Sequence, residues 1–244
     1  MNNQTRATLI LPCYNEAEHF EDSVKRIYTV LDKMNIVWEV IFIDDCSIDN
    51  TPQVIKIYME TPPAINSRAI YHNKNYGRGA TVAEGIRQAT SAIVGYIDID
   101  CEIDPSYIPQ FVEKIQKDYD VICANRIYSF SWTRVMRYMA SKLYVFIQKI
   151  ILGVNFPDTE AGYKFFKKEK ILPILQHIKA RHWFWDTEIM VKAQKAGLSI
   201  VFIPTIFKRR NDKSSTVQLF PDTIDYIKNL WRLRKELKTY ESNS

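Results

Sequence analysis

The sequence predicts an α/β protein whose mostly parallel, doubly wound sheet is covered by helices on both faces. Short apolar runs alternate with segments whose apolar residues recur at helical spacing, which is the pattern of such a sheet. A second observation is that clusters of polar residues follow the predicted strands, where parallel sheets bind ligands. The chain has 244 residues, of which 46% are hydrophobic and 25% charged, enough for one large domain with a sizeable core.

The first half of the chain contains four predicted strands and three predicted helices. The strands cover residues 7–12, 38–43, 67–71 and 92–97. The helices are indicated by apolar residues at Phe20, Val24, Ile27 and Leu31, by Pro52 near a helix start, and by Val82, Ile86 and Ala89. Gly77 and Gly79 precede the third helix, and we expect both to permit a tight turn.

The second half continues the pattern and adds two basic segments. The remaining strands are predicted at 120–124, near Phe166 and at 199–203, with helices after Asp104 and from 182–188 to Gly197. The basic segments are 132–154 and the residues from Asp222 onward. We therefore expect one domain over residues 1–217, including a helix at about 132–154, followed by a basic amphipathic helix and tail over 218–244.

Cysteine content and hydropathy exclude several classes of protein. The four cysteines, Cys13, Cys46, Cys101 and Cys123, form no CxxC pair and predict reduced thiols in a cytosolic protein, without disulfides or a zinc site. We expect no signal peptide, and no run of about 18 apolar residues is present to span a membrane. The net charge of +5 is modest, and we expect no nucleic-acid partner.

Three acidic residues at alternate positions, Asp98, Asp100 and Glu102, follow the fourth predicted strand. On an extended backbone alternate side chains share a face, so these carboxylates can converge on one point. They would repel one another unless a cation lay between them, and oxygen-only ligands suit Mg²⁺ or Mn²⁺. The alternative is a solvated acidic loop that binds nothing.

Polar clusters at four strand ends favour the metal site over the solvated loop. They cover residues 14–16, 44–45, 73–79 and 98–102. The absence of a Walker motif, and of Gly-x-Gly-x-x-Gly after the first strand, argues against NTP hydrolysis and dinucleotide redox chemistry. Asp44, directly after the second strand, is suited to hydrogen-bond a base or ribose. These features favour a nucleotide-diphosphate substrate, because a metal and arginines would neutralise the departing diphosphate.

Several motifs, in order along residues 7–235, resemble the family 2 glycosyltransferases of the GT-A fold. They are Leu-Pro-Cys-Tyr-Asn-Glu at 11–16, Ile-Asp-Asp-Cys-Ser-Ile-Asp-Asn-Thr at 43–51, Asn-Tyr-Gly-Arg-Gly at 75–79 and Asp-Ile-Asp at 98–100. Asp-Thr-Glu-Ala-Gly-Tyr-Lys at 158–164, Trp-Phe-Trp-Asp-Thr-Glu at 183–188 and Lys-Ser-Ser at 213–215 resemble the dolichyl-phosphate mannosyltransferase and glucosyltransferase branch. The resemblance implies a hexosyltransferase with an α/β GT-A fold.

The resemblance also implies a role for individual residues. Pro12, Tyr14, Glu16 and Asp44 would hold the base and ribose of the nucleotide sugar. Asp98, Ile99 and Asp100 would form the D-x-D motif, with Asp100 bridging metal and diphosphate, and Glu102 would be a third metal ligand where the branch often has Gln. Phosphate contacts would come from Arg126, Arg210 and Lys213, with Arg209 as a competitor of Arg210.

The implied reaction is the inverting transfer of glucose or mannose, from UDP-glucose or GDP-mannose, to a polyprenyl phosphate of the dolichyl type. A phosphate monoester is already anionic near pH 7, its second pKa being about 6, so this acceptor needs no strong base. Asp186 aligns with the catalytic carboxylate of other family 2 enzymes. It either orients the acceptor site or a neighbouring Arg, or acts as a base. The alternatives are transfer to a saccharide hydroxyl, with Asp186 as base, and a non-catalytic membrane-surface adaptor.

The basic segment 132–154 is either an ordinary core helix or a helix at a membrane surface, its arginines near lipid phosphates. We expect a peripheral protein on the cytoplasmic face of a membrane, with a separate membrane-anchoring protein as a possible partner.

Some prominent side chains have simpler interpretations. We expect Trp183 and Trp185 to pack in the core instead of stacking on a sugar. His72, His177 and His182 show no metal-ligand spacing, and no role is predicted for them.

Overall fold

The computed structural model describes residues 5–60, 65–128, 147–210 and 219–242. Within these ranges one seven-stranded sheet has the order β3-β2-β1-β4-β6-β5-β7. The strands are β1 (Arg6–Cys13), β2 (Val37–Asp44), β3 (Asn66–Tyr71), β4 (Ile93–Ile97), β5 (Val121–Tyr128), β6 (Tyr163–Lys167) and β7 (Ile200–Phe207). β6 runs antiparallel to β4 and β5, and the other neighbours are parallel. The prediction of an α/β protein with a mostly parallel sheet is confirmed.

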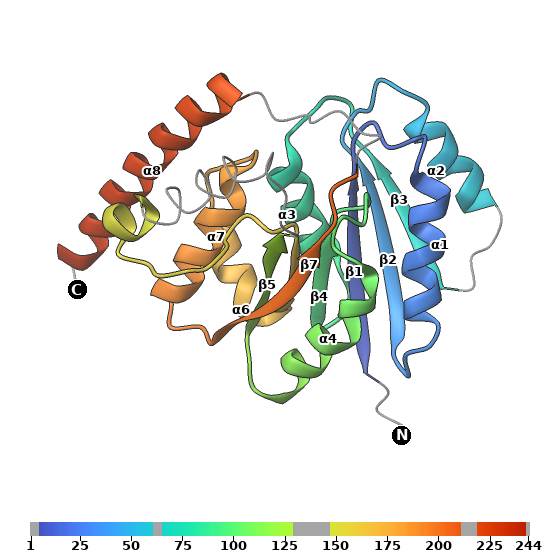
Figure 1. Cartoon of the computed structure of the whole chain (residues 1–244), viewed down its shortest axis with the longest axis horizontal. Helices are drawn as coiled ribbons and strands as arrows, with labels where there is room; N and C mark the ends of the chain where they lie inside the picture. Colours follow the sequence, from blue (N-terminus) through green and yellow to red (C-terminus); the bar gives the residue numbers. More distant parts are fainter. Residues whose placement is uncertain (1–4, 61–64, 129–146, 211–218, 243–244) are drawn as a thin grey trace.

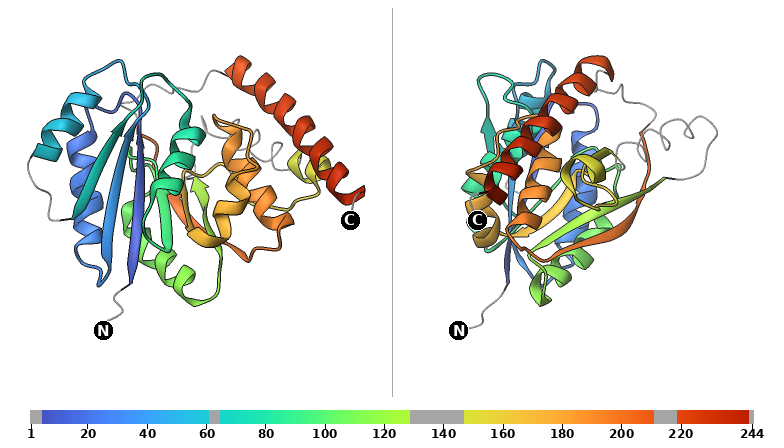
Figure 2. Two further views of the ribbon diagram at one scale, coloured as in Figure 1. Left: turned by 180° about the vertical axis from the view of Figure 1, so that it is seen from behind. Right: turned by 90° about the vertical axis from the view of Figure 1, so that its left-hand side faces the viewer.

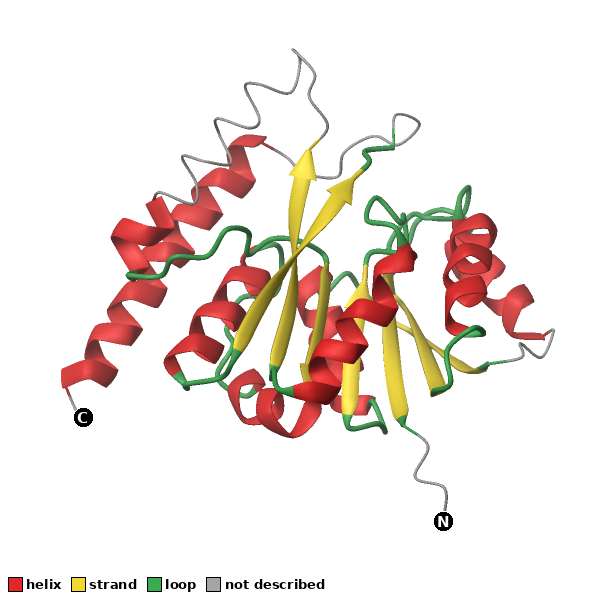
Figure 3. Ribbon diagram, turned by 60° about the horizontal axis from the view of Figure 1, so that its bottom comes forward, coloured by secondary structure: helices red, strands yellow, loops and turns green. Residues whose placement is uncertain are grey.

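Helices cover both faces of the sheet (Figure 1, Figure 2). One face carries α1 (Phe20–Leu31), α2 (Thr51–Glu60), the 3₁₀ turn η1 (Pro105–Tyr107) and α4 (Ile108–Lys117). The other carries α3 (Arg78–Gln88), α6 (Lys168–Leu175) and α7 (Phe184–Lys195), which contact one another. α8 (Leu219–Ser242) contacts α7 at the end of the molecule far from β3 (Figure 3).

The basic segments are described in part. Residues 147–152 form a helix within the predicted segment 132–154, whose earlier residues lie outside the described ranges, as does the predicted boundary at 217–218. Across the described residues, no helix combines the length and the apolar character needed to cross a membrane.

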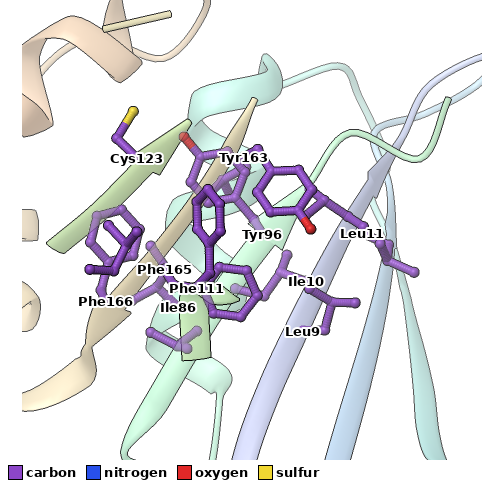
Figure 4. Close-up of a cluster of buried hydrophobic side chains, with 14 of the residues drawn as sticks. Leu9, Ile10, Leu11, Ile86, Tyr96, Phe111, Cys123, Tyr163, Phe165 and Phe166 are labelled. Atoms are coloured by element: carbon purple, nitrogen blue, oxygen red, sulfur yellow. The ribbon is translucent and has the colours of Figure 1, made fainter. Parts of the chain in front are cut away.

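The core packs around the central strands and includes buried side chains of β6. Leu9 and Ile10 of β1 are fully buried because helices cover both faces. The rings of Phe111 on α4 and Phe165 on β6 pack with centroids 5.8 Å apart (Figure 4). Because β6 is antiparallel, its first residue, Tyr163, pairs with the last residue of β4, Ile97. The loop before β6 therefore lies at the edge where the parallel strands end.

Candidate active site

The loops after β1 and β2 are joined by hydrogen bonds between backbone and side chain. The Asn15 N–H donates to Ser47 Oγ at 2.9 Å, and the Ile48 N–H donates to Asn15 Oδ1 at 2.9 Å. Ser47 Oγ in turn donates to the buried Asp44 carboxylate at 2.5 Å. The Glu16 N–H donates to Thr51 Oγ1 at 2.7 Å. These contacts hold together the two loops that carry the predicted base and ribose residues: Pro12, Tyr14, Glu16 and Asp44.

The next aspartate, Asp45, anchors the glycine-rich turn before α3. Its carboxylate accepts the N–H of Tyr76 at 2.8 Å and of Gly77 at 2.9 Å, and it contacts His72 Nδ1 at 2.7 Å. His72 Nε2 lies 3.0 Å from Glu84 on α3. His72, for which the sequence predicted no role, thus ties β3 to α3. The sequence carried one signal for the Asp45–His72 contact, which is that a second aspartate, Asp45, follows Asp44 at the end of β2.

The two glycines of this turn serve different purposes. Gly77 has φ +93°, a backbone conformation that favours glycine, so the predicted tight turn is confirmed there. At Gly79, inside α3, an added Cβ would overlap Cβ of Trp185. The tight-turn explanation is therefore wrong for Gly79, which is small because α7 packs against it. Trp185 is buried as predicted, whereas Trp183 is 37% exposed.

The acidic residues after β4 do not continue the strand. The Cys101 N–H donates to the Asp98 carbonyl at 3.2 Å, and Cys101 has φ +53°, so residues 98–101 form a turn. The prediction that three alternate carboxylates share one face of an extended chain is wrong for this reason. Within the described residues, no three or more His, Cys, Asp or Glu side chains form a metal-binding group.

Asp98 instead contacts a cation from α3. Arg78 Nε and Nη2 donate to Asp98 Oδ1 at 2.8 and 2.7 Å, and Arg78 Nη1 donates to Asp186. Burial raises the pKa of Asp98, against the opposing charge of Arg78. Sequence reasoning missed Arg78, since its motif was interpreted through its glycines.

Asp186 is surrounded by donors inside the protein. Lys164 Nζ donates to Asp186 Oδ1 at 2.5 Å, and both side chains are almost fully buried. The Tyr96 hydroxyl also donates to Asp186. Burial opposes ionisation of Asp186, but the charges of Arg78 and Lys164 outweigh it and lower its pKa. A carboxylate of lowered pKa is a poor proton acceptor.

Asp100 and Glu102 face the end of β7. The Arg210 N–H donates to Glu102 Oε1 at 3.0 Å, and the Lys208 N–H donates to the Glu102 carbonyl at 2.8 Å. Burial and the neighbouring Asp100 charge raise the pKa of Glu102, while the charge of Arg209 opposes them. A carboxylate whose ionisation is opposed by a neighbouring carboxylate fits a divalent cation, whereas Asp98 is already held by Arg78. Lys213 lies outside the described residues.

Arg126 lies on β5 and is held by the loop before β6. Its Nε and Nη2 donate to the two carboxylate oxygens of Asp158 at 2.7 and 2.9 Å. The neighbouring Glu160 is half-buried, and its N–H donates to Asp158 Oδ1 at 3.0 Å. The ion pair between Arg126 and Asp158 therefore fixes this loop against β5. Sequence reasoning did not assign Asp158 as the partner of Arg126.

Glu188, two residues after Asp186 on α7, has a different environment. Its fully buried carboxylate accepts the N–H of Ala180 at 2.9 Å and contacts Lys192 at 2.8 Å and Arg232 at 2.6 Å. Glu188 thus ties the α6–α7 loop and α8 to α7, so its role is structural.

Comparison with known proteins identifies the family. The family model for glycosyl transferase family 2 matches residues 8–174. The chain therefore belongs to this family and is a glycosyltransferase. The structure resembles glucosyl-3-phosphoglycerate synthase from Mycobacterium tuberculosis in complex with UDP, with TM-score 0.70 and 16% identity over 96% of this chain and 81% of that one. It also resembles the mannosyltransferase PcManGT from Pyrobaculum calidifontis in complex with GDP-Man and Mn²⁺, with TM-score 0.61 and 18% identity over 86% of this chain and 59% of that one. These likenesses confirm the GT-A fold.

Curated relatives agree with the polyprenyl-phosphate branch. The glycosyltransferase AglD of Haloferax volcanii is 26% identical over 93% of this chain, which spans 37% of that relative. A dolichyl-phosphate beta-glucosyltransferase of Dictyostelium discoideum is 24% identical over 93% of this chain and 76% of its own length. An undecaprenyl-phosphate 4-deoxy-4-formamido-L-arabinose transferase of Sodalis glossinidius is 28% identical over 48% of this chain and 36% of its own.

Proposed function

We propose that the enzyme transfers glucose or mannose, with inversion, from a nucleoside-diphosphate sugar to a polyprenyl phosphate. The observation that carries this proposal is the environment of Asp186. Held by Arg78, Lys164 and Tyr96, with a lowered pKa, Asp186 is unsuited to deprotonate a hydroxyl. A phosphate acceptor arrives already ionised and needs no such base. The same environment does not support the alternative in which Asp186 activates a saccharide hydroxyl.

The donor would bind across the loops after β1 and β2. Pro12, Tyr14, Glu16 and Asp44 would hold the base and ribose at the adjacent ends of these strands. Mg²⁺ or Mn²⁺, bound by Asp100 and Glu102, would neutralise charge on the diphosphate leaving group.

Basic side chains would bind the phosphates on either side of the reacting carbon. Arg210 is held over the acidic turn, since its N–H is bound by Glu102 and its Nη1 lies 3.5 Å from the Asp100 carbonyl. Arg126, fixed by Asp158, would supply positive charge toward the acceptor. Lys213 would join Arg210 at the diphosphate.

A polyprenyl phosphate lies in a membrane, so the enzyme has to reach the membrane surface. The outer face of α8 is suited to contact that surface. Leu230 and Leu233 are buried against the protein, whereas Ile227 and Trp231 are 47% and 56% exposed. An apolar stripe flanked by basic side chains favours a peripheral position on anionic lipid. We propose that this surface is the cytoplasmic face of a membrane, and that a separate membrane-anchoring protein is a further partner.

The test is incorporation of labelled hexose into lipid. Purified protein, a short polyprenyl phosphate and Mn²⁺ or Mg²⁺ should yield an organic-extractable, mild-acid-labile product with UDP-glucose or GDP-mannose. Chelation should abolish the product. Failure with every common nucleotide sugar would refute the proposal, and absence of donor binding by calorimetry would favour a non-catalytic adaptor.

A further inference from the structure

His72, which directly follows β3, lies between two carboxylates. Its Nδ1 contacts Asp45 Oδ1 at 2.7 Å, and its Nε2 contacts Glu84 Oε2 on α3 at 3.0 Å. The His72 and Asp45 side chains are each 5% exposed, whereas that of Glu84 is 36% exposed. A neutral imidazole carries a proton on one ring nitrogen only, so it would turn a lone pair toward one of these carboxylates. The contacts therefore fit the imidazolium ion, which donates to both.

The groups around His72 favour a proton on its ring. A carboxyl group is a stronger acid than an imidazolium ion, so the proton between His72 and Glu84 belongs to His72. The Tyr76 ring packs edge-on against the His72 ring, and Lys74 Nζ lies 5.0 Å from the Tyr76 centroid. A cavity of about 690 Å³ beside His72 is also lined by Tyr71, Arg87, Lys179 and Arg181. All of these cations are exposed to solvent and screened, whereas Asp45 and Glu84 contact the ring directly.

Asp45 connects His72 to the turn that precedes α3. Its Oδ1 also accepts the Tyr76 N–H at 2.8 Å, and its Oδ2 accepts the Gly77 N–H at 2.9 Å. Arg78 follows as the first residue of α3, and its guanidinium contacts the carboxylates at the end of β4 and on α7. The protonated His72 ring thus ties the beginning of α3, through Asp45, to the second turn of the same helix, through Glu84.

We propose that His72 is a positioning residue that acts in its protonated form by holding α3 so that Arg78 meets its carboxylates in the active site. The inference rests on the proposed function, since it assigns a role within that site. When the ring loses its proton at alkaline pH, it can donate to only one of its two carboxylates. Either loss loosens the part of α3 that carries Arg78, and a less well oriented Arg78 slows transfer.

Glu84→Gln separates the effect of the proton from that of the contact. Gln88 Nε2 donates to Glu84 Oε1 at 2.9 Å, so an amide at this position would keep its oxygen toward Gln88 and turn its N–H group toward His72. A neutral His72 ring could then donate to Asp45 and accept a hydrogen bond from the new amide. Both contacts would form without the second ring proton.

The decisive kinetic measurement is kcat for a short-chain polyprenyl phosphate at pH 7 and pH 9, with saturating donor. In the wild type kcat should fall about threefold over this range, within the effect of one hydrogen bond. Glu84→Gln should show the same kcat at both pH values. Glu169→Gln, an exposed change on α6, is the matched control and should fall as the wild type does. A threefold fall in Glu84→Gln as well would overturn the inference.

His72→Gln separates positioning from a contribution to stability alone. Its amide offers an N–H donor to only one of the two carboxylates and turns its oxygen toward the other. We expect kcat to be about tenfold lower at pH 7 and not to change at pH 9. Donor affinity by calorimetry should change less than about twofold, because Ser47 still holds Asp44. If the urea midpoint fell and kcat did not, His72 would be structural only and the inference would be wrong.

Nuclear magnetic resonance tests the inference without any transfer of hexose. The ring nitrogen resonances of His72, assigned by their loss in His72→Gln, should show two protonated nitrogens at pH 7. One unprotonated nitrogen would refute the inference even if hexose were transferred to a polyprenyl phosphate. Two protonated nitrogens would support it even if this acceptor were not used, provided that amide exchange at Tyr76 and Gly77 is about threefold slower in Glu84→Gln than in the wild type at pH 9. Equal exchange in the two proteins would contradict the proposed link to the turn.

Discussion

The two halves of the site are held together by different kinds of contact. The loops after β1 and β2 are joined by hydrogen bonds from backbone N–H groups to side-chain oxygens, as in the Asn15–Ser47 and Glu16–Thr51 contacts. The side chains near the loop before β6 are joined mainly by contacts between full charges, several of them buried, as in the Arg78–Asp186, Arg126–Asp158 and Lys164–Asp186 pairs. A change of charge should therefore perturb the contacts under the loop before β6 more than those that join the loops after β1 and β2.

This difference follows from what each half has to bind. Hydrogen bonds to backbone groups fix the shape of a loop without adding net charge. Buried ion pairs contribute little net stability, yet removing one partner leaves an uncompensated charge inside the protein. Substitution of single residues on each side tests this difference.

The largest effect should follow Asp186→Asn. The change leaves the buried cations Arg78 and Lys164 without their shared carboxylate, so the free energy of unfolding should fall by about 3 kcal/mol in urea titration. Asp22→Asn, on the exposed first turn of α1, should change it by less than about 0.5 kcal/mol. Equal stability of Asp186→Asn and wild type, with turnover abolished, would restore Asp186 as a catalytic base.

A smaller loss is expected for Glu188→Gln, because the single amide oxygen of Gln can still accept one of the two hydrogen bonds that the N–H groups of Lys179 and Ala180 donate to Glu188. Loss of the charge facing Lys192 and Arg232 should lower the free energy of unfolding by about 2 kcal/mol. Hydrogen exchange of α8 should increase, while nucleotide affinity should not change. Glu113→Gln, in an exposed pair with Lys117, provides the control and should have no measurable effect. A loss of nucleotide affinity in Glu188→Gln would contradict its structural role.

Much of the fold could be predicted from the sequence because its signals are local. Apolar runs ending in polar residues located β1 to β4. Helical spacing located α1 and α3, and Pro52 located the start of α2. The position of β6 could not be predicted in this way, since its insertion between β4 and β5 depends on pairings such as Gly95 with Phe165 that are distant in sequence.

The site was predictable to the extent that its residues lie at strand ends. Arg78 was missed because its partners Asp98 and Asp186 are 20 and 108 residues away. Lys164 carried a usable signal, since a lysine between Tyr163 and Phe165 in an apolar strand requires a buried partner. The turn at Asp98 was not predictable from alternation, because it depends on a positive φ at Cys101.

An intermediate effect is expected for Gly162→Ala, which tests how tightly the loop before β6 covers Asp98. The added methyl group would displace the Arg78–Asp98 contact, costing about 1.5 kcal/mol in unfolding free energy and at least tenfold in kcat/KM. Gly153→Ala is the control, since no atom lies within 4 Å of its added Cβ and only its φ of +68° is strained. That variant should lose about 1 kcal/mol of stability with unchanged kcat/KM. Full activity in Gly162→Ala would show that the loop can move away without consequence.

The smallest effect is a dependence of stability on pH that requires no substrate. The pKa of Glu160 is raised from 4.5 to about 7 in the folded protein. A raised folded pKa means that the stabilising contribution is complete below pH 4.5 and is lost as the pH rises to 7. Glu160→Gln, which cannot ionise, should match the wild type near pH 4.5 and exceed its unfolding free energy at pH 8.

Partial exposure of Glu160 limits this gain to about 1 kcal/mol, less than the full shift would give. Urea titrations of both proteins at pH 4.5 and pH 8 measure it, and Glu169→Gln should show no such crossover. A stability difference that is the same at both pH values would mean that Glu160 ionises normally in the folded state. A gain confined to pH 8 would show that ionisation of Glu160 destabilises the folded protein.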